Sequence, residues 1–293
     1  MKYSLRQVQI FLSAAHYQSI SKAAKELSMS QSAASEALKT LERQFDMQLF
    51  DRVGKTLRLN EFGKSIRPQA QALLDQARDL EAAMMRHSGV GGLKIGATLS
   101  IGNYLAINLL ADFIDRHPHA KTTLHVANTT HIQRMIHNFE LDVGLIEGEI
   151  NDDELESILW REDELVVFCS PGHPLAKKGQ LDNSDIETVP WIVREPGSGT
   201  RQAFDWAMHR HLSRLNIRLE LQHTEAIKRA VEANLGIGCL SAVTLQEAFK
   251  RGSLVPLAIP GYSFERNFYL VLHKRKYRST GIEQWIEQCM NFC

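Results

Sequence analysis

Long apolar runs and paired cysteine motifs are both missing from this 293-residue sequence. Polar residues interrupt every apolar stretch near the N-terminus, which therefore lacks the apolar core of a secretory signal. No run approaches the roughly 18 apolar residues that a membrane-spanning helix needs. The four cysteines, Cys169, Cys239, Cys289 and Cys293, form no CxxC pair. We therefore expect reduced structural thiols, a cytoplasmic location and no membrane partner.

Signature motifs of the common enzyme classes are also missing. The sequence contains no GxSxG nucleophile elbow and no GxxxxGK[ST] phosphate loop. Residues 236–241 (GIGCLS) only approximate a dinucleotide-binding fingerprint. His117-x-His119 and His209-x-His211 have no cysteine or carboxylate partner at a diagnostic spacing, which favours exposed histidines over a metal site. We expect a protein that is not an enzyme and has no metal and no resident cofactor.

The composition is that of a folded, two-domain protein with an uneven charge distribution. Hydrophobic residues make up 44% of the chain and charged residues 23%, with only 18 Gly and 8 Pro. Residues 1–67 contain eleven Lys/Arg and six Asp/Glu, a net charge of +5, whereas residues 93–293 contain 21 and 25, a net charge of −4. A basic end on an otherwise acidic chain indicates that this end alone meets a polyanion.

The first 45 residues show the periodicity of three helices. Leu5, Val8 and Phe11 fall at helical spacing with Leu12 and Ala15, and a short helix over residues 19–27 follows. Ser30 is placed to cap a third helix over residues 31–45. Helix, short turn and helix is the helix-turn-helix layout, in which the second helix of the pair enters the DNA major groove. The alternative is an ordinary three-helix bundle with a solvated polar face.

The start of the third helix carries short polar and charged side chains suited to DNA. Glutamine pairs with adenine, and a carboxylate accepts a hydrogen bond from cytosine. The predicted DNA contacts on this helix are Ser30, Gln31, Ser32, Ser35, Glu36 and Lys39. Residues 49–59 then read as two short strands around a Gly-Lys turn. Arg52, Lys55 and Arg58 decorate this predicted hairpin, as expected of a wing that lies along the phosphate backbone.

The stretch from Leu5 to Gly63 resembles the winged helix-turn-helix of the LysR-type transcriptional regulators. The matching segments are Phe11-Leu12, residues 19–24 (SISKAA), residues 30–35 (SQSAAS), Leu41-Glu42, Leu49-Phe50 and residues 59–63 (LNEFG). The sequence departs from the family at two places. Family members commonly carry Pro where Ser32 stands and a basic residue near Glu36, which puts the base contacts of Glu36 in question.

A long helix with a heptad seam is expected after the wing. Its apolar positions alternate spacings of four and three, and we predict that they form a dimerisation seam: Ile66, Ala70, Leu73, Ala77, Leu80 and Met84. The alternative is a helix that packs on its own domain, but the family resemblance also implies pairing with a second copy. We therefore expect a DNA-binding domain over residues 1–60, a linker helix over 61–88 and a glycine-rich hinge over 89–92.

The remaining two hundred residues alternate predicted strands and helices, which indicates a parallel α/β sheet. Expected strands cover residues 93–98, 122–126, 141–146, 164–169, 191–193, 217–221, 238–240 and 266–273. The expected helices cover residues 105–116, 202–215, 225–234 and 282–290. The family resemblance implies two Rossmann-like lobes of the periplasmic-binding-protein type. Lobe I would comprise residues 93–162 and 267–293, and lobe II residues 163–266.

Polar loops follow two of the predicted strands and open helices. Ligands of open α/β sheets bind at such places, beyond the carboxyl ends of strands. We expect these loops to bind a small anionic effector between the lobes through Thr98, Ser100, Asn128, Glu147, Ser198, Gly199, Thr200 and Arg201. Arg194 is a further source of positive charge, whereas Glu147 is the unusual member because a carboxylate in an anion site is costly unless it is paired. The alternative is that both loops are only helix caps.

These loops also resemble the LysR-type branch tied to sulfur assimilation and carbon fixation, which senses small anionic metabolites. The resulting hypothesis is a transcriptional regulator that binds double-stranded DNA and a small effector, assembles as a homodimer or homotetramer, and contacts RNA polymerase. A solute-binding protein for transport is the rival hypothesis. It explains a two-lobed domain but not the basic N-terminal domain.

Overall fold

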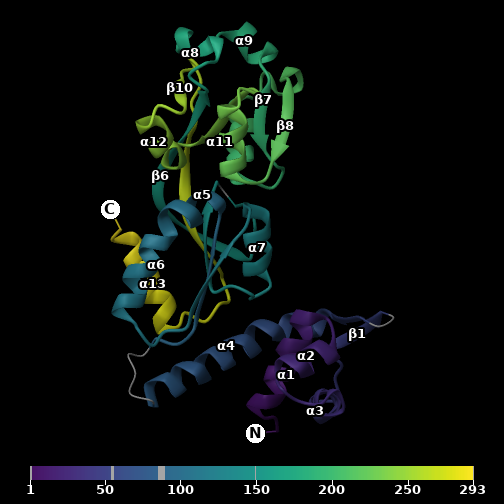
Figure 1. Ribbon diagram of the computed structural model, residues 1–293. Coiled ribbons are helices and arrows are strands. Elements are labelled where there is room, and N and C mark those ends of the chain that lie inside the picture. The colour runs from purple at the N-terminus through teal and green to yellow at the C-terminus, as the bar shows by residue number, and fades with distance from the viewer. Residues whose placement is uncertain (1, 54–55, 85–89, 149, 293) are drawn as a thin grey trace.

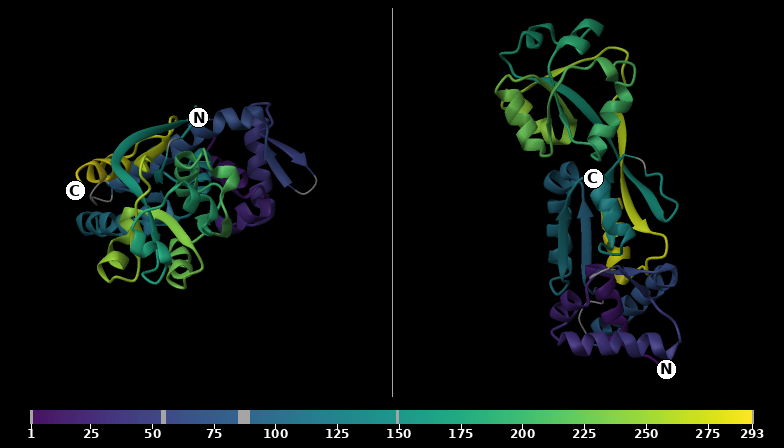
Figure 2. Two further views of the ribbon diagram at one scale, coloured as in Figure 1. Left: turned by 90° about the horizontal axis from the view of Figure 1, so that it is seen from above. Right: turned by 90° about the vertical axis from the view of Figure 1, so that its right-hand side faces the viewer.

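The structure, a computed structural model, describes residues 2–53, 56–84, 90–148 and 150–292, without the side chains of residues 52 and 53. These residues form three tiers (Figure 1). The N-terminal helices and the long helix α4 make up one end, and two α/β lobes are stacked beyond them, as the side view in Figure 2 also shows. The predicted Gly-Lys turn at residues 54–55, residues 85–88 of the predicted linker helix and residue 89 of the predicted hinge lie outside the described residues.

Three short helices form the N-terminal domain: α1 (Leu5–Tyr17), α2 (Ile20–Glu26) and α3 (Gln31–Gln44). Serines cap all three helices, and the predicted cap of α3 is confirmed, because Ser30 Oγ accepts a hydrogen bond from the Ala33 backbone at 3.2 Å. Ala14, Ala23 and Ala34 are fully buried where the helices meet. Their small side chains allow the close approach that a helix-turn-helix requires.

A hairpin of β1 (Phe50–Val53) and β2 (Thr56–Leu59) leads into α4 (Glu61–Met84). Asn60 Oδ1 accepts a hydrogen bond from the Gly63 backbone at 2.8 Å at the start of α4. A side chain at Gly63 would lie 2.2 Å from the Leu49 carbonyl oxygen, so only glycine fits there. This close packing fixes where the long helix leaves the domain.

Lobe I is built on three parallel strands: β3 (Leu93–Ala97), β4 (Thr122–Val126) and β5 (Val143–Glu147). Its helical elements are α5 (Leu99–Ile101), the π-helix η1 (Gly102–Ala106), α6 (Ile107–Arg116), α7 (Thr129–His137) and α13 (Thr280–Met290). The strand order places the carboxyl ends of β3 and β5 side by side. Thr98 and Glu147 are thereby brought to one edge of the sheet.

Lobe II repeats this plan with β7 (Trp191–Arg194), β8 (Ile217–Leu221) and β9 (Ile237–Ser241) as parallel neighbours. Its helical elements are α8 (Pro174–Lys178), α9 (Asn183–Thr188), α10 (Gly199–Ala207), η2 (Leu212–Arg214), α11 (Thr224–Glu232) and α12 (Ala242–Lys250). The expected helix over residues 202–215 is therefore two shorter helical elements.

Two long strands, β6 (Leu155–Cys169) and β11 (Glu265–His273), connect the lobes. They pair antiparallel with each other up to Glu164 and Glu265, and from Leu165 onward β6 pairs antiparallel with β9. The short strand β10 (Val255–Leu257) pairs antiparallel with β6 as well. Among the described residues, the strands of the two lobes form one mixed nine-stranded sheet rather than the expected parallel one.

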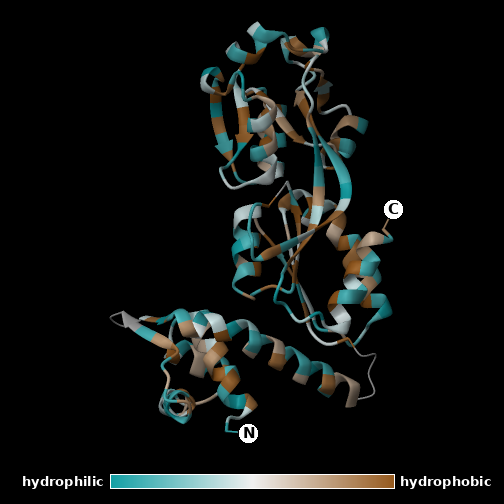
Figure 3. Cartoon of the chain, turned by 180° about the vertical axis from the view of Figure 1, so that it is seen from behind, coloured by the Kyte–Doolittle hydropathy of each residue, from teal (hydrophilic) through white to brown (hydrophobic). Residues whose placement is uncertain are grey.

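The parallel-sheet prediction was wrong for β6, β10 and β11, whose pairings are antiparallel, because alternation with helices does not determine the direction of a returning strand. Each lobe keeps its own apolar core. Phe113 and Trp285 are fully buried in lobe I, while Trp191 and Phe204 lie in the core of lobe II. Figure 3 shows that α4 carries polar and apolar residues in alternation.

Candidate functional site

The N-terminal domain carries a polar groove of about 960 Å³ between α2, α3 and the hairpin. Gln31, Ser35 and Lys39 of the predicted DNA contacts line this groove, together with Ser19 and Ser21 at the start of α2. The groove therefore joins the amino-terminal half of α3 to the hairpin. A helix and a wing that share one concave polar surface match the docking surface of a winged helix-turn-helix.

The other predicted contacts on α3 lie beside this groove. Ser30 and Ser32 are hydrogen-bonded to each other at 3.1 Å at the cap of α3. Glu36 is ion-paired with Arg43, two turns further along the same helix. This pairing gives Glu36 a partner within the protein, so its carboxylate is less available to a cytosine.

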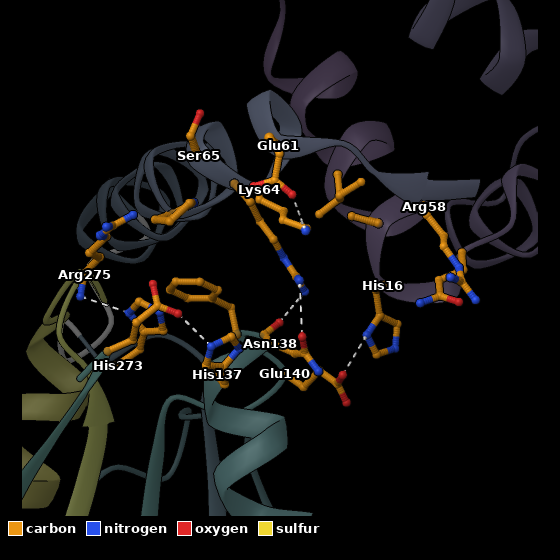
Figure 4. Close-up of a pocket in the computed structure, with 17 residues that line it drawn as sticks. His16, Arg58, Glu61, Lys64, Ser65, His137, Asn138, Glu140, His273 and Arg275 are labelled. Atoms are coloured by element: carbon orange, nitrogen blue, oxygen red, sulfur yellow. Dashed lines mark hydrogen bonds and ion pairs between the residues drawn. The ribbon is translucent and has the colours of Figure 1, made fainter. Parts of the chain in front are cut away.

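The three basic residues of the hairpin have different positions. Lys55 and the side chain of Arg52 lie outside the described residues, and their predicted phosphate contacts stay predictions. Arg58 is exposed and lines a cavity of about 630 Å³ between the hairpin, α4 and lobe I. In Figure 4 Arg58 lies on the side of this cavity opposite Arg275.

A cluster of buried polar side chains lies where the two lobes meet. Thr98 and Ser100 follow β3, Glu147 ends β5, and Ser198 and Thr200 lie at the amino-terminal end of α10. Each of these five residues is only 1–2% exposed. We call this set, with Arg266, the inter-lobe cluster. Hydroxyl, carboxylate and guanidinium groups from both lobes are thus enclosed together.

Several atoms of the inter-lobe cluster have no hydrogen-bond partner within the described residues. They are Ser100 Oγ, Ser198 Oγ, Glu147 Oε1 and Arg266 Nη2. Nη1 of Arg194, the last residue of β7, is also buried without a partner. Buried polar groups are normally paired, because leaving one unpaired costs about 1–3 kcal/mol. Hydrogen-bonding capacity is therefore left unfilled at this one boundary between the lobes.

Arg266 is a buried residue of the inter-lobe cluster that the sequence analysis did not single out. It begins the lobe-connecting part of β11, and its side chain is 3% exposed. Its Nε donates to Asp163 Oδ2 at 2.7 Å, and its Nη1 donates to Thr200 Oγ1 at 3.1 Å. An arginine at the edge of an apolar strand was the available signal, but its partner Asp163 lies 103 positions away.

Arg201 does not join the inter-lobe cluster. Its guanidinium is paired with Asp205 at 2.8 Å and with Glu220 at 2.9 Å, and it also donates to the Arg194 carbonyl oxygen. These contacts fasten α10 to β8 within lobe II. Arg201 therefore holds the start of α10 in place, and the guanidinium within the inter-lobe cluster is that of Arg266.

Asn128 and Gly199 take part in direct contacts between the lobes. Asn128 caps α7 and donates from Nδ2 to Glu195 Oε1 at 3.3 Å. The Gly199 backbone N–H donates to Thr129 Oγ1 at 3.0 Å, and a Cβ at this glycine would lie 2.4 Å from the Glu147 carbonyl oxygen. Close approach of the lobes on this side therefore depends on glycine at position 199.

A second contact between the lobes surrounds Tyr104, which the π-helix η1 presents toward α11. Its hydroxyl donates to Glu225 and accepts a hydrogen bond from Lys228 Nζ at 2.9 Å. Burial, reinforced by the hydrogen bond to Glu225, raises the pKa of Tyr104. The phenol therefore stays protonated and keeps its role as a donor across the boundary.

The predicted dimerisation seam is buried in the first part of α4 and exposed in its last part. Ala70 is buried in the core of the N-terminal domain, and Ile66 and Leu73 pack against that core. Leu80 and Met84, by contrast, are 57% and 72% exposed. An apolar groove of about 280 Å³, lined by residues including Phe45 and Met47, lies next to the first half of the seam.

Polar contacts hold α4 and the N-terminal domain against lobe I. Arg67 donates to the Asn138 carbonyl oxygen, and Lys276 is ion-paired with Asp75. His16 and Glu140 approach to 3.9 Å across the cavity that Figure 4 shows. The N-terminal domain and lobe I are therefore in polar contact at several points.

The structure also describes most of the cysteines and histidines that the sequence analysis considered. Cys169, Cys239 and Cys289 are buried and free, and burial raises the pKa of Cys169 to about 11. The two ring nitrogens of His211 are hydrogen-bonded to Glu187 and Tyr262. In the described part of the chain, no group of three or more His, Cys, Asp or Glu residues is placed to hold a metal ion, and no helix is long and apolar enough to cross a membrane.

Comparison with known proteins identifies the family. Residues 5–64 match the bacterial regulatory helix-turn-helix protein of the lysR family, and residues 86–293 match the LysR substrate binding domain. The uncharacterised HTH-type transcriptional regulator YeiE of Escherichia coli strain K12 is 37% identical over 289 residues, covering 99% of this chain and 98% of YeiE. The RuBisCO operon transcriptional regulator of Allochromatium vinosum is 31% identical and covers 94% of this chain and 92% of its own.

Solved structures agree with this assignment. The regulatory domain of CcmR from Synechocystis PCC6803, in complex with 2-PG, is 30% identical with a TM-score of 0.63 and covers 69% of this chain and 96% of its own. A full-length OxyR variant from Pseudomonas aeruginosa shares the fold with a TM-score of 0.73 at 21% identity, covering 99% of this chain and 94% of its own. The chain belongs to the LysR family of transcriptional regulators. It combines a DNA-binding helix-turn-helix with an effector-binding domain, which does not favour the solute-binding hypothesis.

Proposed function

We propose that this regulator is controlled by a small anion bound in the inter-lobe cluster. The observation that carries the proposal is the set of buried, unpartnered atoms from both lobes: Ser100 Oγ from lobe I, Ser198 Oγ from lobe II, and Arg266 Nη2 on the strand that connects them. A ligand that contacts both lobes binds their closed arrangement more tightly than an open one. It therefore shifts the population toward closure.

The donors in the cluster favour an acidic ligand. Arg266 offers a free N–H, and Arg194 offers another at the end of β7. The serine hydroxyls donate as readily as they accept. Enclosed hydrogen bonds between a guanidinium and an oxyanion are about twice as strong as neutral ones. The regulatory domain of CcmR, which is 30% identical, was solved in complex with 2-PG, and this supports a small-molecule effector for the corresponding domain of this chain.

Calorimetry on the full chain tests the proposal. A panel of carboxylates, phosphate esters and inorganic oxyanions is titrated into the wild type, Ser100→Ala and the control Ser157→Ala, whose side chain lies exposed on β6. We expect the tightest anion to lose about tenfold in affinity in Ser100→Ala, corresponding to one hydrogen bond to a charged group. Equal binding by wild type and Ser100→Ala would place the site elsewhere and leave the two loops as helix caps.

For DNA, we propose that Gln31, Ser35 and Lys39 face the major groove and that Arg52, Lys55 and Arg58 follow the phosphates. The polar groove that contains the first three residues supports this placement.

We propose domain boundaries at residues 1–60, 61–88, 89–92 and 93–293, and we propose that the chain passes from one lobe to the other near residues 162 and 267. Strand β6 pairs with β11 up to Glu164 and with β9 from Leu165 onward, which supports this position for the first crossing between the lobes.

We propose further that the chain dimerises through α4 and assembles into a homotetramer. Two α4 helices paired antiparallel would place the exposed Leu80 and Met84 of one copy against the apolar groove beside Phe45 and Met47 of the other. Burying these side chains removes apolar surface from water.

As a regulator of transcription, the protein would act on DNA in the cytoplasm and contact RNA polymerase there.

A further inference from the structure

Glu147 supplies the carboxylate of the inter-lobe cluster. It is 1% exposed, and its Oε1 has no partner among the described residues. The nearest cationic atom recorded beside it is Arg266 Nη2, at 3.9 Å, which is too long for a hydrogen bond. A buried carboxylate oxygen with no donor is costly. The site therefore lacks a hydrogen-bond donor at Oε1 as well as an acceptor for Arg266.

The charge on Arg266 is already balanced by another residue. Asp163 Oδ2 lies 2.7 Å from Arg266 Nε, and the side chains of both residues are less than 5% exposed. Asp163 Oδ1 also accepts a hydrogen bond from Ser241 at 2.8 Å, which holds it in this position. One guanidinium and two carboxylates leave this part of the cluster with a net negative charge. A fully deprotonated anion placed here would set an oxygen against Glu147 with no proton to donate to it.

We infer that the effector is an oxyanion that retains a hydrogen-bond-donating proton, and that Glu147 accepts this proton. This inference rests on the proposed function and specifies the ligand class of the same site. The remaining oxygens of the effector accept hydrogen bonds from Arg266 Nη2 and from the Ser100 and Ser198 hydroxyls. Each unpartnered atom of the cluster then acquires a partner of the correct polarity, because arginine only donates and a carboxylate only accepts.

The same arrangement gives selectivity against fully deprotonated anions. A site built to receive a hydrogen bond rejects an analogue that lacks the donor, because its own polar group is then left unpaired. Sulfate and hydrogen phosphate have the same tetrahedral shape and four oxygens. At neutral pH hydrogen phosphate keeps a proton and sulfate keeps none, so the pair isolates the role of the proton.

Calorimetric titration of sulfate and of inorganic phosphate into the full chain, purified without either anion, tests this inference. We expect the wild type to bind phosphate at least ~10-fold more tightly than sulfate. In Glu147→Gln the side-chain amide can donate to an oxyanion, so the preference should fall or reverse in favour of sulfate. The control Glu247→Gln removes an exposed carboxylate on α12 and should keep the wild-type preference.

The outcomes separate this inference from the proposed function. If the wild type binds both anions equally and Ser100→Ala weakens both, the effector site stands and the role of Glu147 is refuted. If Ser100→Ala leaves the binding of both anions unchanged, the proposed site itself is refuted. A wild type that binds neither anion contradicts the inference, since a site made for a protonated oxyanion should accept phosphate. An unchanged preference in Glu147→Gln contradicts it as well.

Discussion

Lys276 Nζ lies 2.8 Å from Asp75 Oδ2. This ion pair joins lobe I to the linker helix α4, although the two residues are 201 positions apart in the sequence. The same ammonium lies 2.7 Å from Asp142 Oδ1, and its side chain is only 3% exposed. Asp142 is fastened in turn by the Lys94 backbone, which donates to its Oδ2 at 2.7 Å. One buried lysine thus ties the DNA-binding half of the chain to the sheet that carries Thr98 and Glu147.

Replacing this lysine should be strongly destabilising. In Lys276→Met the carboxylates of Asp75 and Asp142 stay buried without their cation, and breaking a buried pair in this way costs about 3–5 kcal/mol. Urea denaturation should show the loss as a lower midpoint. Lys274→Met is the matched control, because Lys274 is exposed and the recorded hydrogen bond of its side chain is to the Asp153 carbonyl oxygen. Equal midpoints for the two variants would contradict the account.

The contribution of Lys276 should also depend on pH at the alkaline end. Burial alone lowers the pKa of Lys276, but the carboxylates of Asp142 and Asp75 outweigh it and raise the pKa above its ordinary value. A raised lysine pKa gives stability that is full below about pH 10.4 and is lost as the pH rises through the folded-state pKa. The difference between wild type and Lys276→Met should therefore shrink above that pH and stay constant between about pH 7 and 9.

The exposed end of the seam gives a test of assembly that does not disturb the monomer fold. Leu80→Glu combined with Met84→Glu places charge on side chains that are exposed in one chain but buried in the proposed dimer. Light scattering should show a smaller oligomer with an unchanged helical content. Gln76→Glu, which adds one negative charge at an exposed position of α4 outside the seam, is the control. An unchanged mass for the double variant would mean that α4 does not mediate dimerisation.

Base readout should depend on Gln31 more than on Glu36. Gln31 lines the polar groove, whereas Glu36 is paired with Arg43. Gln31→Ala should change the discrimination between DNA sequences by about 1–3 kcal/mol. Binding to a randomised DNA pool, followed by sequencing, measures this directly for both variants. A larger change for Glu36→Ala than for Gln31→Ala would reverse our assignment of the recognition face.

The wing should contribute affinity without sequence preference. Lys55→Ala removes one predicted phosphate contact, so the slope of log affinity against log salt should fall by about 0.9. Gel shifts at several salt concentrations give this slope. A change in preferred sequence with an unchanged slope would show that Lys55 reads bases.

Tyr104 should slow the escape of the effector. Tyr104→Phe removes the hydrogen bonds that join η1 to Glu225 and Lys228 across the lobes, each worth about 1 kcal/mol. Stopped-flow measurement should show faster effector dissociation by about tenfold. Tyr17→Phe, in the N-terminal domain, is the control. Equal dissociation rates would mean that this contact does not restrain lobe opening.

Local signals in the sequence were sufficient where a structural feature depends on nearby residues. The Ser30 cap depends on a backbone group three positions away, and the residues after β3 and β7 follow directly from the strand ends. The first half of β6 was missed because Glu156, Arg161 and Glu162 obscure its apolar pattern. The pairing of Arg266 with Asp163 joins residues 103 positions apart, which no local pattern indicates.

Arg201 illustrates the same limit from the other direction. Its place after a glycine-rich loop favoured a role in anion binding, whereas the guanidinium is paired with Asp205 and Glu220. Asp205 stands four positions along the helix, a spacing that allows an ion pair and was a readable signal. Glu220 belongs to the neighbouring strand, and only the fold brings it close.

The most direct test of the central claim measures the geometry of bound DNA while an anion fills the inter-lobe cluster. A DNA fragment selected for tight binding carries a donor and an acceptor fluorophore at its ends, and energy transfer is followed as the tightest anion is added. We predict a saturable change in transfer for the wild type and for Ser157→Ala, with the midpoint raised about tenfold in Ser100→Ala. An anion that binds the wild type without changing the transfer, or that acts on Ser100→Ala at the wild-type midpoint, would contradict the account.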